Sequence, residues 1–144
     1  MSQPSPLAPE KFPNLPAVPG VEISGLHVGL KPTKGVKDLM MARLARGTTI
    51  AGVFTQSKCP SAPVDWCRSV IGQGSARALI VNSGNANAFT GNAGDIVVSE
   101  TVRAAAKLLK CPKREVFVAS TGVIGVPVPP DYIAGKLPRM VKAN

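Results

Sequence analysis

The sequence predicts a mixed α/β domain, and three observations lead to this prediction. Strand-like runs at 76–82 and 115–120 lie on either side of a stretch with helical periodicity at 95–110, an order typical of a β-α-β unit. The chain of 144 residues is long enough to form one domain with a substantial core. Its content of 44% hydrophobic and 17% charged residues is typical of a globular protein rather than a disordered one.

The first part of the chain changes character near residue 20. Residues 1–19 contain six prolines and no periodicity, which predicts an irregular arm, so that the domain itself covers residues 20–144. Three β-rich runs follow, at 21–30, 37–45 and 48–56, and they predict a meander of strands.

A short helix is predicted for residues 62–74, APVDWCRSVIGQG. Pro63 and Asp65 suit the first turn of a helix, whereas Gly72 and Gly74 suit its end.

The clearest helical pattern runs from residue 95 to residue 110. Asn92 and Asp95 resemble the start of a capping box, and Pro112 prevents the helix from continuing. The residues expected on the apolar face of the 95–110 helix are Val98, Val102, Ala105 and Leu109.

A further helix is predicted at 132–141.

The charge and cysteine content narrow the function classes. Seventeen Lys and Arg against eight Asp and Glu give a net charge of +9, which suits an anionic substrate, a nucleic acid or an acidic partner chain. The basic residues are scattered and are not interleaved with aromatics, so nucleic-acid binding is the weaker alternative. No apolar run is long enough to span a membrane, and no secretory signal is recognisable. Three cysteines without a CxxC pair indicate reduced thiols rather than zinc ligands, so we expect a cytoplasmic protein.

Two segments that follow predicted strands are candidates for chemistry. The first, residues 82–94, contains four Asn, three Gly and no charged residue. The second, ASTGVIG at 119–125, can present a hydroxyl and an unobstructed N–H to a developing oxyanion, because Gly122 has no side chain. The alternative is a turn in which Ser and Thr cap local backbone groups, and the spacing alone favours this alternative.

Other catalytic arrangements are not supported. His27 is the only histidine, and its strand-like context favours a structural role. The cysteines are expected to be buried small hydrophobes rather than nucleophiles. No phosphate-binding glycine motif and no carboxylate pair are present. The residues therefore supply candidate oxyanion donors but no convincing nucleophile.

Three long blocks of the sequence resemble a known family. KDLMMARLARGTTIAGVFTQSKCPSAPV, ARALIVNSGNANAFTGNAG and VFVASTGVIGVPVPPD are similar to successive blocks of the glutamate N-acetyltransferase family, also called ornithine acetyltransferase. The resemblance runs in order from about Val21 to about Asp131, and the strings VNSGNANA and STGVIG are its most specific parts.

The resemblance implies a fold and a reaction. Family members are layered α-β-β-α sandwiches of the self-cleaving, N-terminal-nucleophile type, and they move acetyl from N-acetylornithine to glutamate in arginine biosynthesis. Cleavage frees a threonine whose own α-amine serves as the base, so no cofactor is required, although some members also accept acetyl-CoA as a co-substrate. The family assembles as two α and two β chains. By this resemblance, Thr121 and Gly122 form the oxyanion hole.

One departure from the family pattern is important. The sequence contains no segment that matches the family's nucleophile, so it is interpreted as the N-terminal, α-chain portion, inactive without the C-terminal β chain. We expect Asn82, Asn85 and Asn87 to support the pocket without touching substrate, and Gly122→Ala to lower turnover without harming the fold. A fragment of a related self-cleaving aminopeptidase and a basic nucleic-acid-binding module remain the alternatives.

Overall fold

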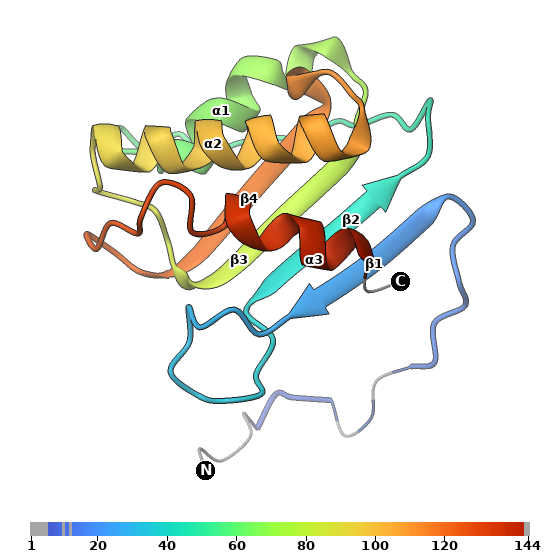
Figure 1. Ribbon diagram of the computed structural model, residues 1–144, viewed down its shortest axis with the longest axis horizontal. Helices are drawn as coiled ribbons and strands as arrows, with labels where there is room; N and C mark the ends of the chain where they lie inside the picture. The colour runs from blue at the N-terminus through green and yellow to red at the C-terminus, as the bar shows by residue number, and fades with distance from the viewer. Residues whose placement is uncertain (1–5, 10, 12, 143–144) are drawn as a thin grey trace.

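The computed structural model describes residues 6–9, 11 and 13–142, and these residues form a four-stranded sheet with helices packed against it (Figure 1). Within the described residues the sheet order is β1-β2-β3-β4. The pairs β1–β2 and β2–β3 are antiparallel, whereas β3–β4 is parallel. The strands are β1 (Val21–Leu26), β2 (Leu39–Leu44), β3 (Ala78–Asn85) and β4 (Val116–Val123).

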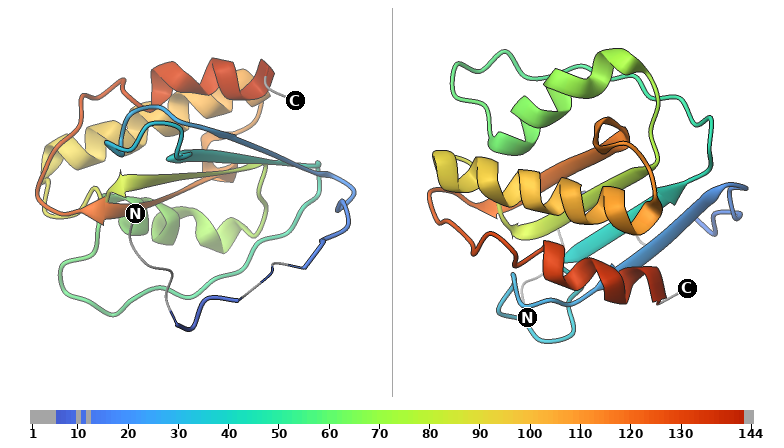
Figure 2. Two further views of the ribbon diagram at one scale, coloured as in Figure 1. Left: turned by 90° about the horizontal axis from the view of Figure 1, so that it is seen from below. Right: turned by 45° about the horizontal axis from the view of Figure 1, so that its top comes forward.

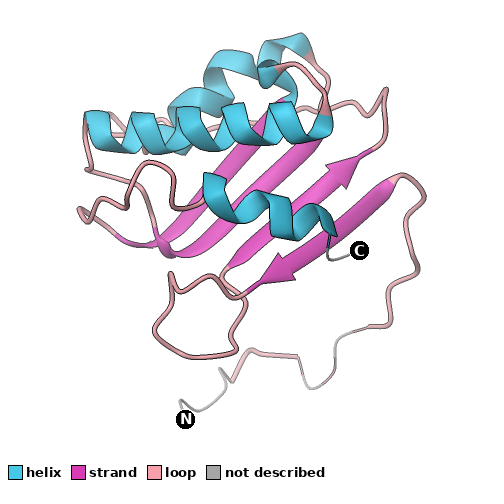
Figure 3. Cartoon of the chain, in the orientation of Figure 1, coloured by secondary structure: helices cyan, strands magenta, loops and turns pink. Residues whose placement is uncertain are grey.

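Two of the helices cover one face of this sheet. Helices α2 (Asn92–Leu109) and α3 (Leu137–Lys142) lie on the same side of the strands, as the left view of Figure 2 shows. On the opposite face Ile23 of β1 is 66% exposed. In the same view helix α1 (Ala62–Val70) lies on the other side of the strands. The mixed α/β class predicted from the sequence is therefore confirmed (Figure 3).

Helix α1 (Ala62–Val70) packs beside β4, the edge strand next to the site described below. Trp66 Nε1 donates a hydrogen bond of 2.9 Å to the carbonyl oxygen of Val116. The Cys67 thiol donates to the carbonyl oxygen of Val118 at 3.2 Å. An edge strand has unpaired backbone groups, and these two side chains satisfy part of that row.

The helical predictions are largely correct. The predicted β-α-β unit is present as β3, α2 and parallel β4, and Val102 and Ala105 of α2 are completely buried. Helix α1 ends in a single 3-10 turn (Ile71–Gln73) that closes at Gly74, and the predicted helix at 132–141 is a 3-10 turn followed by α3.

Two local predictions are wrong. The capping box does not form, because α2 begins at Asn92 and its N-cap is Gly91, without a side-chain cap hydrogen bond. The run 48–56 is not a strand, because β2 is already paired with β1 and β3 on its two sides. Only Thr49 makes an isolated bridge, to Ser75.

The predicted irregular arm lies partly outside the described residues. The residues described between 6 and 19 contain no helix or strand, which agrees with the prediction for 1–19 as far as the structure describes it.

Candidate functional site

The candidate site lies where the parallel strands β3 and β4 end side by side. Both strands continue further than the sequence indicated, so part of each predicted loop is strand: β3 reaches Asn85 and β4 reaches Val123. The pairing becomes irregular at Gly84 and Asn85, where the register shifts. The glycines and amides looked like a loop because they lack β propensity, but backbone pairing with the neighbouring strand holds them in place.

Thr121 and Gly122 are both exposed at this end of β4, opposite Ser83 and Gly84 of β3. The N–H and carbonyl groups of Val118 point to the outer edge of the sheet, where they contact Cys67.

The two sides of β4 differ at this point. Ser120 donates a hydrogen bond of 2.6 Å to Asn82 Oδ1, on the side of the sheet that α2 covers. The neighbouring side chain of Thr121 therefore projects from the opposite side, which these helices leave free. Thr121 and Gly122 thus present one hydroxyl and one backbone N–H on exposed surface at a strand end.

Gly122 is required by the contact between the strands. Its φ is +134°, and a Cβ built on it would lie 2.6 Å from the backbone nitrogen of Asn85 and closer still to the carbonyl carbon of Gly84. Such contacts involve backbone atoms that cannot rotate away. The expectation that Gly122→Ala would leave the fold unharmed is therefore wrong.

The three asparagines of the first candidate segment are buried, with exposed fractions of 3% for Asn82, 5% for Asn85 and 4% for Asn87. Asn82 Nδ2 donates to the carbonyl oxygen of Asn85 at 2.8 Å, and Asn85 Nδ2 donates to that of Val126 at 2.6 Å. Asn87 Nδ2 donates to the carbonyl oxygen of Gly94 at 3.0 Å. These hydrogen bonds agree with the expectation that the three amides satisfy neighbouring polar groups, and their supporting role at the pocket stays a prediction.

Backbone hydrogen bonds join the two candidate segments beyond the ends of the strands. The N–H of Ala86 donates to the carbonyl oxygen of Val123 at 2.9 Å. The N–H of Gly125 donates to the carbonyl oxygen of Ala88, also at 2.9 Å. These bonds join residues 86–88 to residues 123–125, at or directly after the strand ends that contain Thr121 and Gly122.

His27 has the structural role that the sequence indicated. Its Nδ1 lies 2.8 Å from the carbonyl oxygen of Val36 and 3.3 Å from Asp38 Oδ2. A carbonyl oxygen only accepts hydrogen bonds, so Nδ1 carries the proton in this geometry.

Asp38 is the residue that sequence reasoning missed. It is 2% exposed and accepts backbone N–H groups from Val28 and Lys31. Burial raises the pKa of this carboxyl, but the hydrogen bonds from Lys31 and Val28 and the nearby His27 outweigh that effect, so the pKa is lowered from its ordinary value. The sequence does contain one indication of a buried carboxylate: Asp38 stands directly before the apolar run LMM, with no other acidic residue near it.

The cysteines do not form a catalytic or metal site. All three are free, and burial raises the pKa of the Cys67 and Cys111 thiols. Cys59 was expected to be buried but is exposed, because it lies in the segment without helix or strand that precedes α1. Among the described residues no group of three His, Cys, Asp or Glu side chains is placed to hold a metal ion.

In the part of the chain that the structure describes, no helix has the length and apolar character needed to span a membrane.

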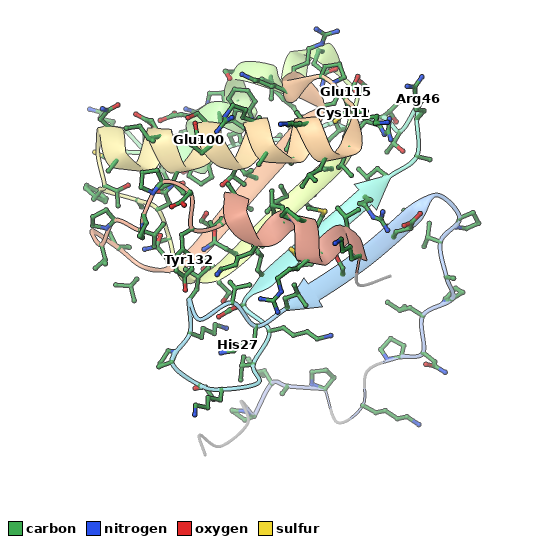
Figure 4. The ribbon with its side chains drawn as sticks, in the orientation of Figure 1. His27, Arg46, Glu100, Cys111, Glu115 and Tyr132 are labelled. Carbon is green, nitrogen blue, oxygen red and sulfur yellow. The ribbon has the colours of Figure 1, made fainter. Side chains whose placement is uncertain are left out.

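A second concave surface lies at the other end of the molecule. Figure 4 shows Arg46, Cys111 and Glu115 together there, away from His27 and Tyr132. They line an open cavity of about 320 Å³ together with Arg77. Glu115 interrupts the basic residues, so this cavity is not a continuous basic surface of the kind that binds nucleic-acid backbones.

Comparison with known proteins identifies the family. The sequence matches the ArgJ family over residues 22–144, and the chain belongs to this family. It is 48% identical over 138 residues to the arginine biosynthesis bifunctional protein ArgJ of Bradyrhizobium diazoefficiens, covering 96% of this chain and 33% of that protein. It is 54% identical over 124 residues to the protein of the same name from Mesorhizobium japonicum, covering 86% of this chain and 30% of that protein.

Solved structures show the same relationship. The arginine biosynthesis bifunctional protein ArgJ of Bacillus halodurans superimposes with a TM-score of 0.75 at 35% identity, over 83% of this chain and 62% of that one. The ornithine acetyltransferase of Mycobacterium tuberculosis, solved with ornithine, gives a TM-score of 0.76 at 33% identity, over 87% of this chain and 67% of that one. This chain spans about a third of the length of the relatives it matches in sequence.

Proposed function

We propose that this chain is the N-terminal portion of a glutamate N-acetyltransferase, and that Thr121 and Gly122 stabilise the oxyanion of its acetyl-transfer steps. The observation that carries the proposal is the ArgJ family match over residues 22–144. Both residues are exposed at the end of β4, with a hydroxyl and a backbone N–H available to a ligand. Family membership favours acetyl transfer over the aminopeptidase and nucleic-acid-binding alternatives.

In the first step a threonine hydroxyl outside this sequence attacks the acetyl carbonyl carbon of N-acetylornithine. The carbon–nitrogen bond then breaks, the hydroxyl proton goes to the departing amine, and ornithine leaves. In the second step the amine of glutamate attacks the acetyl ester, and the proton returns to the threonine oxygen. Each step passes through a tetrahedral species with negative charge on the former carbonyl oxygen, and this charge is what the two donors stabilise.

An uncharged surrounding suits this role. The buried amides of Asn82, Asn85 and Asn87 hold the strand ends with hydrogen bonds and add no charge near the developing oxyanion. A carboxylate in the same place would repel the oxyanion, and a further cation would compete for the carboxylate of glutamate.

The remaining parts of the enzyme are also proposals. The C-terminal chain of the same precursor would supply the nucleophilic threonine and its α-amine, and two chains of each kind would form the assembly. The reaction would need no cofactor, with acetyl-CoA as a possible second acetyl donor, and would take place in the cytoplasm. The M. tuberculosis structure with ornithine supports an ornithine-type ligand for this family.

The test is Thr121→Val in the complete protein, assayed for acetyl transfer from N-acetylornithine to glutamate. Valine keeps the shape of threonine and removes the hydroxyl, so we expect kcat to fall by about 100- to 1,000-fold, as for other single oxyanion donors. Thr33→Val is the matched control, because Thr33 is exposed in the 27–38 segment. An unchanged kcat in Thr121→Val would remove the proposed role of the hydroxyl.

A further inference from the structure

The segment that follows β1 is fixed by one buried carboxylate. Asp38 Oδ1 accepts the N–H of Val28 at 2.6 Å. Its Oδ2 accepts the N–H groups of Gly29 at 3.1 Å and Lys31 at 2.9 Å. Three hydrogen bonds to a charged acceptor, buried to 2% exposure, fix the backbone of residues 28–31.

The same segment is held from a second direction by Tyr132. The Tyr132 hydroxyl donates a hydrogen bond of 2.8 Å to the carbonyl oxygen of Val28, which lies 104 positions earlier in the chain. Figure 4 shows Tyr132 at the same end of the molecule as His27. A Cβ built on Gly29 would lie 3.1 Å from this hydroxyl, so the segment and Tyr132 are in close contact.

Residues 28–31 in turn press against β3. A Cβ built on Gly84 would lie 2.5 Å from the carbonyl oxygen of Leu30 and 2.7 Å from its carbonyl carbon, and the φ of Gly84 is +113°. The carbonyl oxygen of Asp38 also accepts the N–H of Ser83 at 2.9 Å, directly before Gly84. The Asp38 carboxylate therefore fixes the backbone on both sides of Leu30. The carbonyl oxygen of Asp38 fixes the part of β3 that Leu30 contacts.

The backbone of Gly84 is in direct contact with that of Gly122. The position of a Cβ on Gly122 falls on the backbone of Gly84 and Asn85, so no side chain separates the two strands there. Leu30, Gly84 and Gly122 are stacked backbone on backbone, and we call them the backbone stack. Close-packed atoms of this kind transmit a displacement instead of absorbing it.

We infer that Asp38 is a positioning residue for the acetyl-transfer site: through the backbone stack it fixes where Thr121 and Gly122 present their donors. This inference rests on the proposed function of that pair. Asp38 lies on the far side of the stack from Gly122 and acts only through the backbone. The sequence alone gave it no such role.

The principal test is Asp38→Asn in the complete protein. The amide keeps the size of the side chain but replaces one acceptor oxygen with an NH2 group, which cannot accept the N–H groups now bound there. We expect kcat to fall by about 10- to 100-fold, since misplacement by about 1 Å can cost that much, with the KM for N-acetylornithine nearly unchanged. Asp131→Asn, at an exposed carboxylate, is the matched control and should have normal kcat.

A double-mutant cycle separates positioning from general destabilisation. If Asp38 acts through the oxyanion donors, Asp38→Asn should cost much less in kcat when Thr121 is already valine. Equal costs in the two backgrounds would overturn the inference. An unchanged kcat in Thr121→Val alone would contradict the proposed function of Thr121. This result differs from the one that overturns the inference about Asp38, in which Thr121→Val lowers kcat but Asp38→Asn costs the same with and without it.

Hydrogen exchange gives a readout that does not depend on activity. In Asp38→Asn, amides of residues 119–125 should exchange faster, together with those of 28–31, whereas amides of α1 should not change. Unchanged exchange at 119–125 would overturn the inference, even in a protein that transfers no acetyl group.

A milder variant covers the case in which Asp38→Asn does not fold. Tyr132→Phe keeps the ring and removes only the hydrogen bond to Val28, so it should produce the same pattern with a smaller fall in kcat. Normal kcat and normal exchange at 119–125 in Tyr132→Phe, beside an Asp38→Asn protein that does not fold, would reduce Asp38 to a folding role and contradict the inference.

Discussion

The first and second halves of β3 and β4 are continuous in the same ladder, yet they are held in different ways. The first halves are apolar and regular: Ala78 and Ile80 pair with Val116 and Val118, and all four are buried. The second halves contain glycine, hydroxyl and amide residues and show a register shift at Gly84 and Asn85. Burial of apolar side chains stabilises the first halves, whereas backbone contacts and buried amides stabilise the second.

This difference shows how a rigid scaffold can end in a polar, exposed site. Apolar side chains anchor one end of each strand under α2, so the other end can expose Thr121 and Gly122 without losing its place. The asparagines replace apolar packing where the strands leave the core, because each is buried and donates a hydrogen bond to a backbone carbonyl oxygen.

The largest effect is expected in the apolar half. Val102 of α2 is completely buried in the core cluster, so Val102→Asp places an unpaired charge there and should unfold the domain, at a cost of several kcal/mol. Leu108→Asp is the matched control, because Leu108 is on the same helix and 37% exposed. Thermal unfolding measures both. A cooperatively folded Val102→Asp protein with the melting temperature of Leu108→Asp would show that α2 is oriented wrongly.

The next effect tests the backbone stack in the polar half. Gly122→Ala forces a Cβ against the backbone of Asn85 at a φ of +134°, so we expect a loss of at least about 1–3 kcal/mol in the free energy of unfolding, together with lower kcat. Gly72→Ala is the control, since a Cβ there meets nothing within 4 Å. Chemical denaturation of the two variants gives the comparison. Equal stability in both would mean that the strands are not in close contact at Gly122.

A smaller effect is expected from the buried amides. Asn87→Ala removes the donor to the carbonyl oxygen of Gly94 and the acceptor of the Thr90 hydroxyl, so it should cost about 1–3 kcal/mol in the free energy of unfolding. Asn92→Ala, at an exposed position in the first turn of α2, should cost much less. If denaturant melts gave the two variants the same stability, the buried amides would not be what holds this half.

The smallest effect is expected from pH, through Asp38. The pKa of its carboxyl is lowered in the folded protein, so the corresponding stability is fully present above the unfolded value of about 3.9. It is lost as the pH falls below that value toward the folded pKa. Asp38→Asn should therefore show a weaker loss of stability between about pH 5 and pH 2 than the unmodified protein in acid titrations of the melting temperature. Parallel titration curves would show that the carboxylate is not stabilised by folding.

The apolar half could be predicted from the sequence, and much of the polar half could not. Val98, Val102 and Ala105 recur at helical spacing, so the pattern itself specifies α2 and the strands around it. The run 48–56 has a β-rich pattern, but strand pairing depends on which strand edges are free in the fold, and a sequence does not show this. The contacts of Gly122 with Gly84, and of both with Asp38 through Leu30, join residues far apart in the chain. No local pattern records them.

The most direct measurement is a crystal structure of the complete protein with its threonine acetylated or with a tetrahedral analogue bound. We expect the acetyl or analogue oxygen to lie about 2.7–3.1 Å from both the Gly122 nitrogen and the Thr121 hydroxyl oxygen, the distance range of oxyanion hydrogen bonds. An oxygen bound by other donors, with Thr121 and Gly122 directed elsewhere, would contradict the role assigned to this end of the sheet.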